Sequence, residues 1–318
     1  MALDQLEHIL KYGNIEFHYF SYGLDIKGFR DKNEYLDDGW FLWKCAMLNT
    51  VLTNHDYTCI LRDKELFAMV LENWGIMTPK TVACVHTSEE AASHIKALFS
   101  KEGRYFCKPL DGECGSGVFK LIINGDFSEI NGKGMTNDEA KSVVLENVIL
   151  RPYLIQTLVE QHPDIERIYD KSINTLRLVT VFNRVKMEVV PVSAVLRIGT
   201  HGNTVDNWAK GGLAVGVDLT NGTLNRFAFY KQGKGTKTLT HPDSGICFAG
   251  LTIPFFKEAI QVAKDLHSRL NSIAVIGWDI AITPSGPLFI EGNDNMEISL
   301  NQEANGGLAK VFYSIIRA

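Results

Sequence analysis

Residues 277–295 read GWDIAITPSGPLFIEGNDN, in which apolar and polar residues alternate on both sides of the tetrapeptide TPSG. Alternation with a period of two is typical of β-strands, and the proline and glycine between them favour a turn. If Pro284–Gly286 form a three-residue loop, Asp279 and Glu291 lie directly opposite each other in an antiparallel pair. Asn293 then shares their face of the sheet. The stretch therefore predicts a hairpin that brings two carboxylates and an amide together.

Two like charges about 4 Å apart repel by about 4 kcal/mol at an effective dielectric constant near 20. A hard cation removes that cost, and Mg²⁺ prefers oxygen ligands, usually one or two carboxylates with substrate phosphates. One interpretation is therefore a magnesium site at Asp279, Glu291 and Asn293. The alternative is a solvated hairpin whose acidic side chains face water, and the spacing alone does not decide between them.

A second motif is FCKPLDGECGSGVFKL, residues 106–121. A predicted strand ends near Lys108, and a loop with three glycines leads into another strand. Glycines let backbone N–H groups approach a phosphate closely, and a lysine adds a compact positive charge. No GxxxxGK[ST] sequence occurs, so this is not a Walker P-loop. The alternative is a glycine-rich hairpin with an incidental lysine.

Length and composition exclude several classes of protein. With 318 residues, 45% apolar and 22% charged, the chain has room for two lobes with sizeable cores. A net charge of -5 gives no basic field for nucleic acid. No apolar run reaches the roughly 20 residues that span a bilayer, and the first residues do not resemble a signal peptide. Six cysteines without a CxxC pair indicate reduced thiols and a cytoplasmic protein.

The predicted elements describe an α+β protein without internal repeats. Helices are expected from three- and four-residue apolar spacing, and Ser88 is expected to cap the third of them. The helices are expected at 37–52, 62–75, 88–103, 138–148, 253–270 and 306–316. Strands are expected at 76–85, 104–110, 117–125, 153–159, 173–182, 186–199, 211–219 and 223–230, with two more in the hairpin of residues 277–293. The second half, rich in alternating runs, predicts a mostly antiparallel sheet.

The two motifs in this order, about 180 residues apart, resemble the ATP-grasp superfamily. RDKELFAMVLENWGIMTP and YLIQTLVEQH resemble its first lysine helix and its adenine-binding hinge. SINTLRLVT and DNWAKGGLAVGVDLTNG are most similar to the sugar-transfer-associated ATP-grasp branch. The resemblance covers residues 60–305 and implies an ATP-grasp fold of two α+β lobes with the nucleotide between them. It implies an aromatic-rich segment 1–57 in place of the usual first domain, an N-terminal lobe 58–155 and a C-terminal lobe 156–318.

The resemblance also implies roles for individual residues in binding ATP. Lys64 matches the first ATP lysine and Lys108 the lysine at the α-phosphate. The flap over the β- and γ-phosphates would contain Gly112, Gly115, Ser116 and Gly117. Backbone groups for adenine would come from Gln156, Thr157, Leu158 and Val159. Gln161 or His162 would contact the ribose, although His162 is equally well explained as a surface histidine.

For catalysis, the resemblance implies that Asp279, Glu291 and Asn293 hold Mg²⁺ and that Arg177 points at the transferring phosphoryl group, with Asn174 beside it. The alternative for Arg177 is a strand arginine paired with an acid. Lys210 is a further phosphate or carboxylate contact or simply an exposed lysine. Acceptor-binding residues often lie where this chain has Ser299, Asn301 and Gln302.

These expectations define an ATP-dependent carboxylate–amine ligase with ATP and Mg²⁺ as cofactors. A small-molecule carboxylate would be converted to an acyl phosphate, which an amine attacks to give an amide, ADP and phosphate. The branch suggests a role in cell-surface polysaccharide or amino-sugar biosynthesis. One alternative is a kinase that phosphorylates a hydroxyl of a sugar-like molecule, and another is a non-catalytic nucleotide-binding module. An oxidoreductase is disfavoured because no strand–GxGxxG–helix unit occurs.

Overall fold

The computed structural model describes residues 2–13, 15–51, 56–111, 117–231, 233 and 235–316. The chain separates into two units, each built on a six-stranded antiparallel sheet. Residues 1–59, 161–287 and 291–318 form the first unit, and residues 60–160 with 288–290 form the second. The predicted fold class, two α+β units with antiparallel sheets, is confirmed. The predicted three-part domain division and the position of a nucleotide between the lobes stay predictions.

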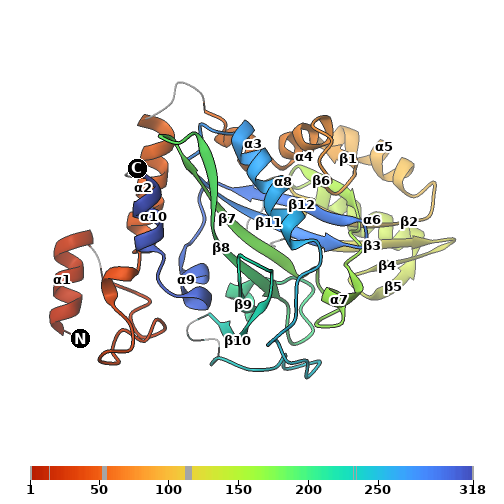
Figure 1. The fold of residues 1–318 in the computed structure, drawn as a ribbon. Coiled ribbons are helices and arrows are strands. Elements are labelled where there is room, and N and C mark those ends of the chain that lie inside the picture. The colour runs from red at the N-terminus through yellow and green to blue at the C-terminus, as the bar shows by residue number, and fades with distance from the viewer. Residues whose placement is uncertain are drawn as a thin grey trace. The chain divides into compact units, whose positions relative to one another are not determined.

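The sheet of the first unit has the strand order β10-β9-β8-β7-β11-β12, so β7 lies at its centre between β8 and β11 (Figure 1). Its strands are β7 (Thr175–Asn183), β8 (Glu188–Ile198), β9 (Leu213–Val217), β10 (Leu224–Tyr230), β11 (Val275–Thr283) and β12 (Gly286–Asn293). Every residue of β11 is buried, which identifies it as an interior strand.

Helices cover both faces of this sheet. One face packs on α8 (Phe256–Arg269), where Thr180 of β7 contacts His267. The opposite face, which carries Val179, packs on α2 (Asp38–Val51), α9 (Ser299–Asn305) and α10 (Ala309–Ile316). Figure 1 shows α2 and α10 side by side, although some 260 residues separate them along the chain.

The aromatic-rich N-terminal segment belongs to this first unit rather than standing apart. It contains α1 (Ala2–Tyr12), η1 (Lys32–Glu34), α2 and the start of α3 (Thr58–Arg62). The buried side chain of Gln302 binds both the N–H and the C=O of Leu36, at 2.7 and 2.8 Å. Asp38 accepts hydrogen bonds from the N–H groups of Ile298 and Ser299. The segment is therefore held by polar bonds as well as by the shared core.

The second unit has the strand order β1-β6-β2-β3-β4-β5. Its strands are β1 (Thr81–Val85), β2 (Gly103–Pro109), β3 (Phe119–Asn124), β4 (Phe127–Ile130), β5 (Lys133–Thr136) and β6 (Tyr153–Thr157). Its helices are α4 (Lys64–Asn73), α5 (Ser88–Leu98) and α6 (Asn137–Val148). One face of the sheet forms the core with α5 and α6 through side chains such as Val85, Cys107 and Val144.

Most predicted elements are present, with a few differences. Thr87 rather than Ser88 caps α5, because the Thr87 hydroxyl accepts the hydrogen bond from Glu90 N–H. The hairpin of β4 and β5 was not predicted. Short helices α7 (Pro163–Glu166) and η2 (Trp208–Lys210) complete the first unit. Among the described residues, no helix combines the length and the apolar character needed to cross a membrane.

Candidate functional site

A cluster of charged side chains lies at the centre of the first unit's sheet. Asp279 of β11 pairs directly with Arg177 of β7 in the antiparallel ladder, so both side chains point to one face. Arg177 Nε donates to Asp279 Oδ1 at 2.5 Å and Nη2 donates to Oδ2 at 2.9 Å. This two-pronged geometry is the strongest form of arginine–carboxylate pairing. The Asp279 carboxylate is only 5% exposed, so the pair is buried.

A second arginine, Arg197 of β8, completes the cluster. Its Nη1 donates to Asp279 Oδ2 at 3.0 Å and its Nη2 donates to Asp206 Oδ1 at 3.0 Å. Asp206 also accepts hydrogen bonds from the hydroxyl and the N–H of Thr175. Arg197 therefore bridges two buried carboxylates, and its own Nε is buried without a hydrogen-bond partner.

The pKa shifts in the cluster follow from burial and from these ion pairs. Burial raises the pKa of Asp279, but Arg177 and Arg197 lower it by more, so the net pKa lies below its usual range. Burial lowers the pKa of Arg197, but the charges of Asp206 and Asp279 raise it by more, so the net shift is upward. For Asp206 burial dominates the opposing effect of Arg197, and its pKa is raised. Asp279 is thus held ionised and the guanidinium stays charged.

This cluster changes the reasoning about the acidic hairpin. Asp279 and Glu291 do come together, since Glu291 hydrogen-bonds to Asp279 and lowers its pKa. From the sequence, either a cation or exposure to water could relieve their repulsion. In the structure, Arg177 and Arg197 already compensate Asp279. Two alternatives were predicted for Arg177. The structure shows that it pairs with an acid, Asp279, while the contact with a phosphoryl group stays a prediction.

The remaining ligand atoms fit a divalent cation. A carboxylate has about four lone-pair positions. On Asp279 the two arginines use three of them and Glu291 uses the fourth, so the ligands that remain are those of Glu291 and Asn293. Glu291 adds a further carboxylate, and Asn293 lies nearby, with its Nδ2 donating to Gly277 O at 3.4 Å. Counting Asp206, the cluster holds three carboxylates against two guanidinium groups. Once Glu291 releases the proton of its hydrogen bond to Asp279, it and Asn293 offer the oxygen ligands that Mg²⁺ prefers, with phosphate oxygens as the other ligands.

Gly277 lies in close contact with the side chain of Met296. A Cβ at this position would lie 2.2 Å from the sulfur of Met296 and 3.5 Å from Arg177 Cδ. The bare backbone therefore leaves the room in which Met296 and the aliphatic part of Arg177 pack beside Asp279. This explains why the strand reads Gly-Trp-Asp at the point where β11 enters the cluster.

Two predicted catalytic residues have other positions. Asn174 is fully buried and donates to Tyr169 O at 2.7 Å, while its Oδ1 accepts from Gly199 N at 3.2 Å. Its amide therefore holds the loop before β7, and its place beside Arg177 stays a prediction. Lys210 ends η2 as an exposed residue, followed by Gly211 with φ +97°. The loop that leads to Lys210 contributes Asp206 to the cluster, through its ion pair with Arg197.

Gln161 was predicted as a ribose contact, but its side chain is buried and bonded within the first unit. Its Oε1 accepts from Asn174 N at 2.6 Å and its Nε2 donates to Tyr169 O at 3.3 Å. His162 caps α7 by accepting the N–H of Asp164 on Nδ1 at 3.1 Å. Of the two predicted ribose contacts, only His162 keeps a partly exposed ring.

In the second unit, the predicted phosphate residues lie around the ends of the glycine-rich loop. Lys108 lies on β2 and is 7% exposed. Lys64 Nζ donates to Leu110 O at 2.8 Å, at the start of the loop. At its other end Gly117 has φ +73°, and a Cβ there would collide with Arg151, so only glycine fits. The predicted flap residues Gly112, Gly115 and Ser116 lie outside the described residues.

The predicted hinge is already partly bonded within its own unit. The N–H of Thr157 donates to Lys80 O at 2.9 Å, and that of Leu158 donates to Arg104 O at 2.8 Å. The buried Gln156 side chain donates to Pro79 O. Each N–H group has one hydrogen to donate, so the amides of Thr157 and Leu158 are committed. The N–H of Val159 and the carbonyl groups of residues 156–159 therefore remain as candidates for hydrogen bonds to adenine.

Helix α9 carries the residues predicted for the acceptor. Gln302 binds Leu36 and the Tyr22 hydroxyl, which makes it structural. Asn301 donates to Ser193 Oγ at 2.9 Å, but its Oδ1 is buried without a partner, as is the hydroxyl of Ser299. Buried polar atoms without partners are rare, so these two groups are candidates for binding a substrate.

Sequence reasoning missed Arg197 and Asp206. Arg197 lies in VSAVLRIG, where a charged residue interrupts a strand of otherwise buried apolar residues. Asp206 begins the DNWAKGG motif, in which the sequence predicted a role for Lys210 alone. A charge in a buried strand must be paired, so Arg197 was the available signal that a second carboxylate lay opposite.

Solved structures that are similar to this chain share little of its sequence. No curated protein sequence matches the chain. Among solved structures, D-alanyl-alanine synthetase A from Vibrio cholerae is similar with a TM-score of 0.47 and 13% identity, over 80% of this chain and 63% of that one. The D-cycloserine synthetase DcsG is similar with a TM-score of 0.47 and 13% identity, over 91% of this chain and 87% of that one. The chain thus spans less than two thirds of the first of these.

The model of the sugar-transfer associated ATP-grasp family matches residues 48–315, which is most of the chain. The match includes the charged cluster, both sheets and the glycine-rich loop. The chain belongs to the sugar-transfer associated ATP-grasp family.

Proposed function

We propose that this protein is an ATP-dependent carboxylate–amine ligase. The γ-phosphoryl group of ATP is transferred to a substrate carboxylate, and an amine displaces phosphate from the resulting acyl phosphate to form an amide. Membership of an ATP-grasp family supports the use of ATP. The family's association with sugar transfer supports a substrate from amino-sugar or cell-surface polysaccharide biosynthesis.

The observation that carries the proposal is the buried ionic cluster of Arg177, Arg197 and Asp279. Burying two guanidinium groups and their carboxylates costs desolvation energy that apolar residues of similar size would avoid. Such clusters are often found at functional sites. Phosphoryl transfer is catalysed mainly by positioning and by positive charge near the equatorial oxygens. Arg177, held from one side by Asp279, is the group we assign to that role.

The metal is assigned to Glu291 and Asn293, which lie beside Asp279. A magnesium ion bound there would neutralise negative charge on the phosphates of ATP. The ion pairs with the two arginines keep Asp279 ionised and fix its direction. Glu291 is therefore the residue whose loss reports on the metal, because replacing Asp279 would also break its buried ion pairs with Arg177 and Arg197.

The acceptor is assigned to α9. The hydroxyl of Ser299 and Oδ1 of Asn301 are buried without partners, and α9 begins six residues after Asn293. Each of these atoms is a candidate contact for the acceptor. A ligase and a kinase would use the same phosphoryl donor, and they differ in the acceptor group alone.

The test is an analysis of products. The purified protein is incubated with ATP, Mg²⁺ and a panel of amino acids, amino sugars and sugar acids, and the nucleotide and phosphate products are quantified. We expect ADP and free phosphate in equal amounts, together with an amide. Glu291→Gln should lower the rate by at least about 100-fold, since the loss of one charge-stabilising contact costs about 3 kcal/mol in the transition state.

The matched control is Glu297→Gln, which changes an exposed carboxylate paired with Lys231 on the surface. It should keep the wild-type rate. Phosphate retained on a hydroxyl of the acceptor would replace the ligase with a kinase. AMP with pyrophosphate among the products would contradict the phosphoryl-transfer step itself.

A further inference from the structure

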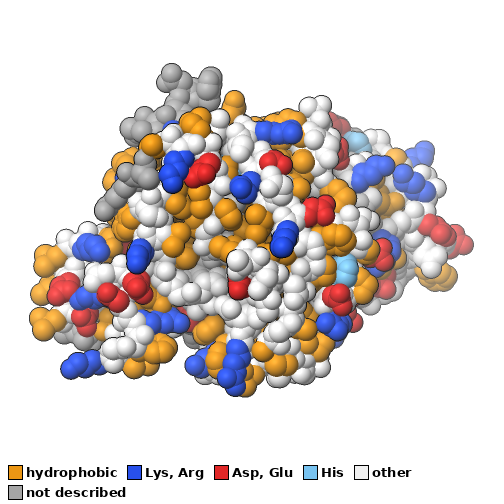
Figure 2. Space-filling model, in the orientation of Figure 1, with side chains coloured by type: hydrophobic (Ala, Val, Ile, Leu, Met, Phe, Trp, Pro, Cys, Tyr) orange, Lys and Arg blue, Asp and Glu red, His pale blue; other side chains and the backbone are white. Residues whose placement is uncertain are grey.

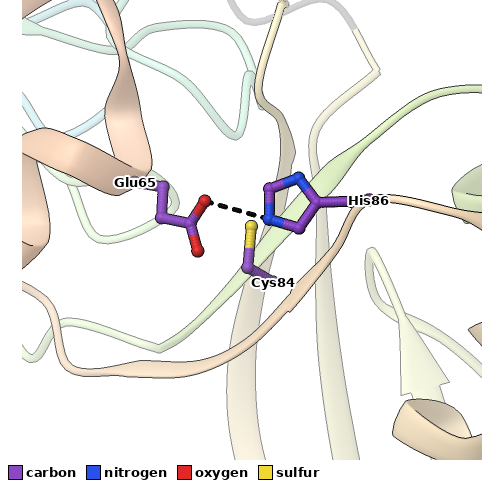
Figure 3. A group of neighbouring side chains, drawn as sticks. All are labelled: Glu65, Cys84 and His86. Carbon is purple, nitrogen blue, oxygen red and sulfur yellow. Dashed lines mark ion pairs between the residues drawn. The ribbon is translucent and has the colours of Figure 1, made fainter. Parts of the chain in front are cut away.

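Three side chains of types that bind metal ions lie together in the second unit. Glu65 is in the first turn of α4, Cys84 is in the edge strand β1, and His86 follows that strand. Their ligand atoms lie within 4.8 Å of one another. Figure 3 shows the Glu65 carboxylate and the Cys84 sulfur on the same side of the His86 ring.

Local structure explains why these residues meet. Cys84 and His86 are two residues apart, so their side chains point to the same face of an extended chain. The neighbouring Val85 is fully buried and points to the opposite face, into the core. Asp63 caps α4 by accepting the N–H groups of Glu65 and Leu66, both at 2.9 Å, which fixes the turn that carries Glu65.

The geometry differs from that of a catalytic relay. In a relay, the acid and the thiol contact different nitrogens of the histidine ring. Here His86 Nε2 lies 3.0 Å from Glu65 Oε2, and the Cys84 sulfur lies near the same nitrogen. Three ligand atoms that converge on one point leave a position for an ion between them.

We propose that Glu65, Cys84 and His86 bind a zinc ion or a similar borderline divalent metal ion. Sulfur, imidazole nitrogen and carboxylate oxygen together are the ligands of zinc, whereas a hard ion such as Mg²⁺ prefers oxygen alone. Tetrahedral zinc with bonds of about 2.0–2.3 Å places ligand atoms roughly 3.3–3.8 Å apart. Side chains that lie within 4.8 Å reach that spacing by small rotations.

Charge and access support this assignment. Glu90 accepts a hydrogen bond from His86 N–H at 3.2 Å, so a further carboxylate lies beside the group. Binding of an ion must release the thiol proton of Cys84 to solvent. The His86 ring is 49% exposed, which leaves a route for the ion and for water as the fourth ligand.

The proposed ion shares the sheet of the second unit with the predicted phosphate lysine Lys108. In the ladder, Cys84 pairs with Leu154 of β6, and Leu154 pairs with Lys108 of β2. Cys84 thus lies on the same face of the sheet as Lys108, two strands away, or about 10 Å at roughly 4.8 Å per strand. The metal would tie α4, which carries Lys64, to the edge of that sheet.

The test uses Co²⁺ as a spectroscopic substitute for zinc. The full-length protein is stripped of metal and titrated with Co²⁺ in an excess of Mg²⁺ and without nucleotide. We expect one equivalent to bind, with the thiolate-to-cobalt charge-transfer band and the intense visible bands of tetrahedral cobalt. Cys84→Ser should abolish the charge-transfer band, and His86→Ala should weaken binding at least tenfold.

The control is Cys247→Ser, which removes an exposed thiol of the first unit and should leave the spectrum unchanged. Urea unfolding of Cys84→Ser in a chelator should match that of the wild type, which separates a lost ligand from a lost fold. The proposal is overturned if the wild-type protein gives no charge-transfer band, or if that band survives Cys84→Ser. Neither result would affect the ligase assignment, which is read from ADP and phosphate.

Discussion

Arg197 shows how one side chain decides what its neighbours can do. It is the common partner of Asp206 and Asp279, which come from a loop and from β11. Its guanidinium compensates both carboxylates. Removing Arg197 therefore takes one buried ion pair from each of them. At this scale the sequence predicted Asp279, but neither Asp206 nor the arginine that makes the burial of both acids possible.

Arg197→Ala should therefore lower the free energy of unfolding by about 3–5 kcal/mol, the usual cost of breaking a buried ion pair from one side. Arg226→Ala is the matched control, because Arg226 is exposed on β10 and should change stability by less than about 0.5 kcal/mol. Urea unfolding of the three proteins gives the comparison. Equal stability of the two variants would mean that the cluster does not hold its charges as described.

At the scale of elements, α8 is joined to the sheet by a buried polar chain. Trp278 Nε1 donates to Thr180 Oγ1 at 2.9 Å, and Thr180 contacts His267 Nδ1 at 2.7 Å. His267 Nε2 lies 2.9 Å from Ile273 O, which requires a hydrogen on that nitrogen. Nδ1 then accepts the Thr180 hydroxyl hydrogen, so the ring is neutral.

Burial lowers the pKa of His267 to about 4, and its hydrogen bond to Ile273 opposes the shift only in part. In the unfolded chain this pKa returns to about 6.5, so the unfolded state binds more protons between these values. The contribution of the neutral His267 ring to the free energy of unfolding is therefore complete above about pH 6.5. It falls as pH drops toward 4, by about 3 kcal/mol in total. Urea unfolding between about pH 7.5 and 4.5 should show this slope.

His267→Gln should flatten that pH dependence, whereas His201→Gln should keep it, because His201 is 64% exposed. A variant at His267 that keeps the full wild-type slope would assign the pH dependence to other groups. The two substitutions remove the same ring from a buried and from an exposed position, which makes them a matched pair.

Elements with strong periodicity were predictable, and those that depend on one turn or one distant partner were not. The alternating run KMEVVPVSAVLRIG and the helix with His267 lie where the pattern placed them. The β4–β5 hairpin turns at Asn131 and Gly132, both with positive φ, so the Asn-Gly pair was a signal that went unused. The place of the N-terminal segment depends on Gln302, 266 residues from its partner Leu36, and no local pattern encodes that contact.

For the whole molecule, two distant motifs in the right order were enough to predict the family, because each combines residue types that are rare together. The pairing of charges was not predictable, because Arg177, Arg197 and Asp279 lie on three strands and meet only through the ladder. Sequence spacing gave the candidate metal ligands Glu291 and Asn293, while the structure added the arginines that hold Asp279 in place.

The most direct measurement is a crystal structure of the protein with Mg²⁺ and a non-hydrolysable ATP analogue. We predict a metal ion bound to Glu291 and Asn293, with Arg177 within hydrogen-bonding distance of the terminal phosphate. A nucleotide bound elsewhere, with no metal at Glu291, would contradict the assignment of this cluster to phosphoryl transfer.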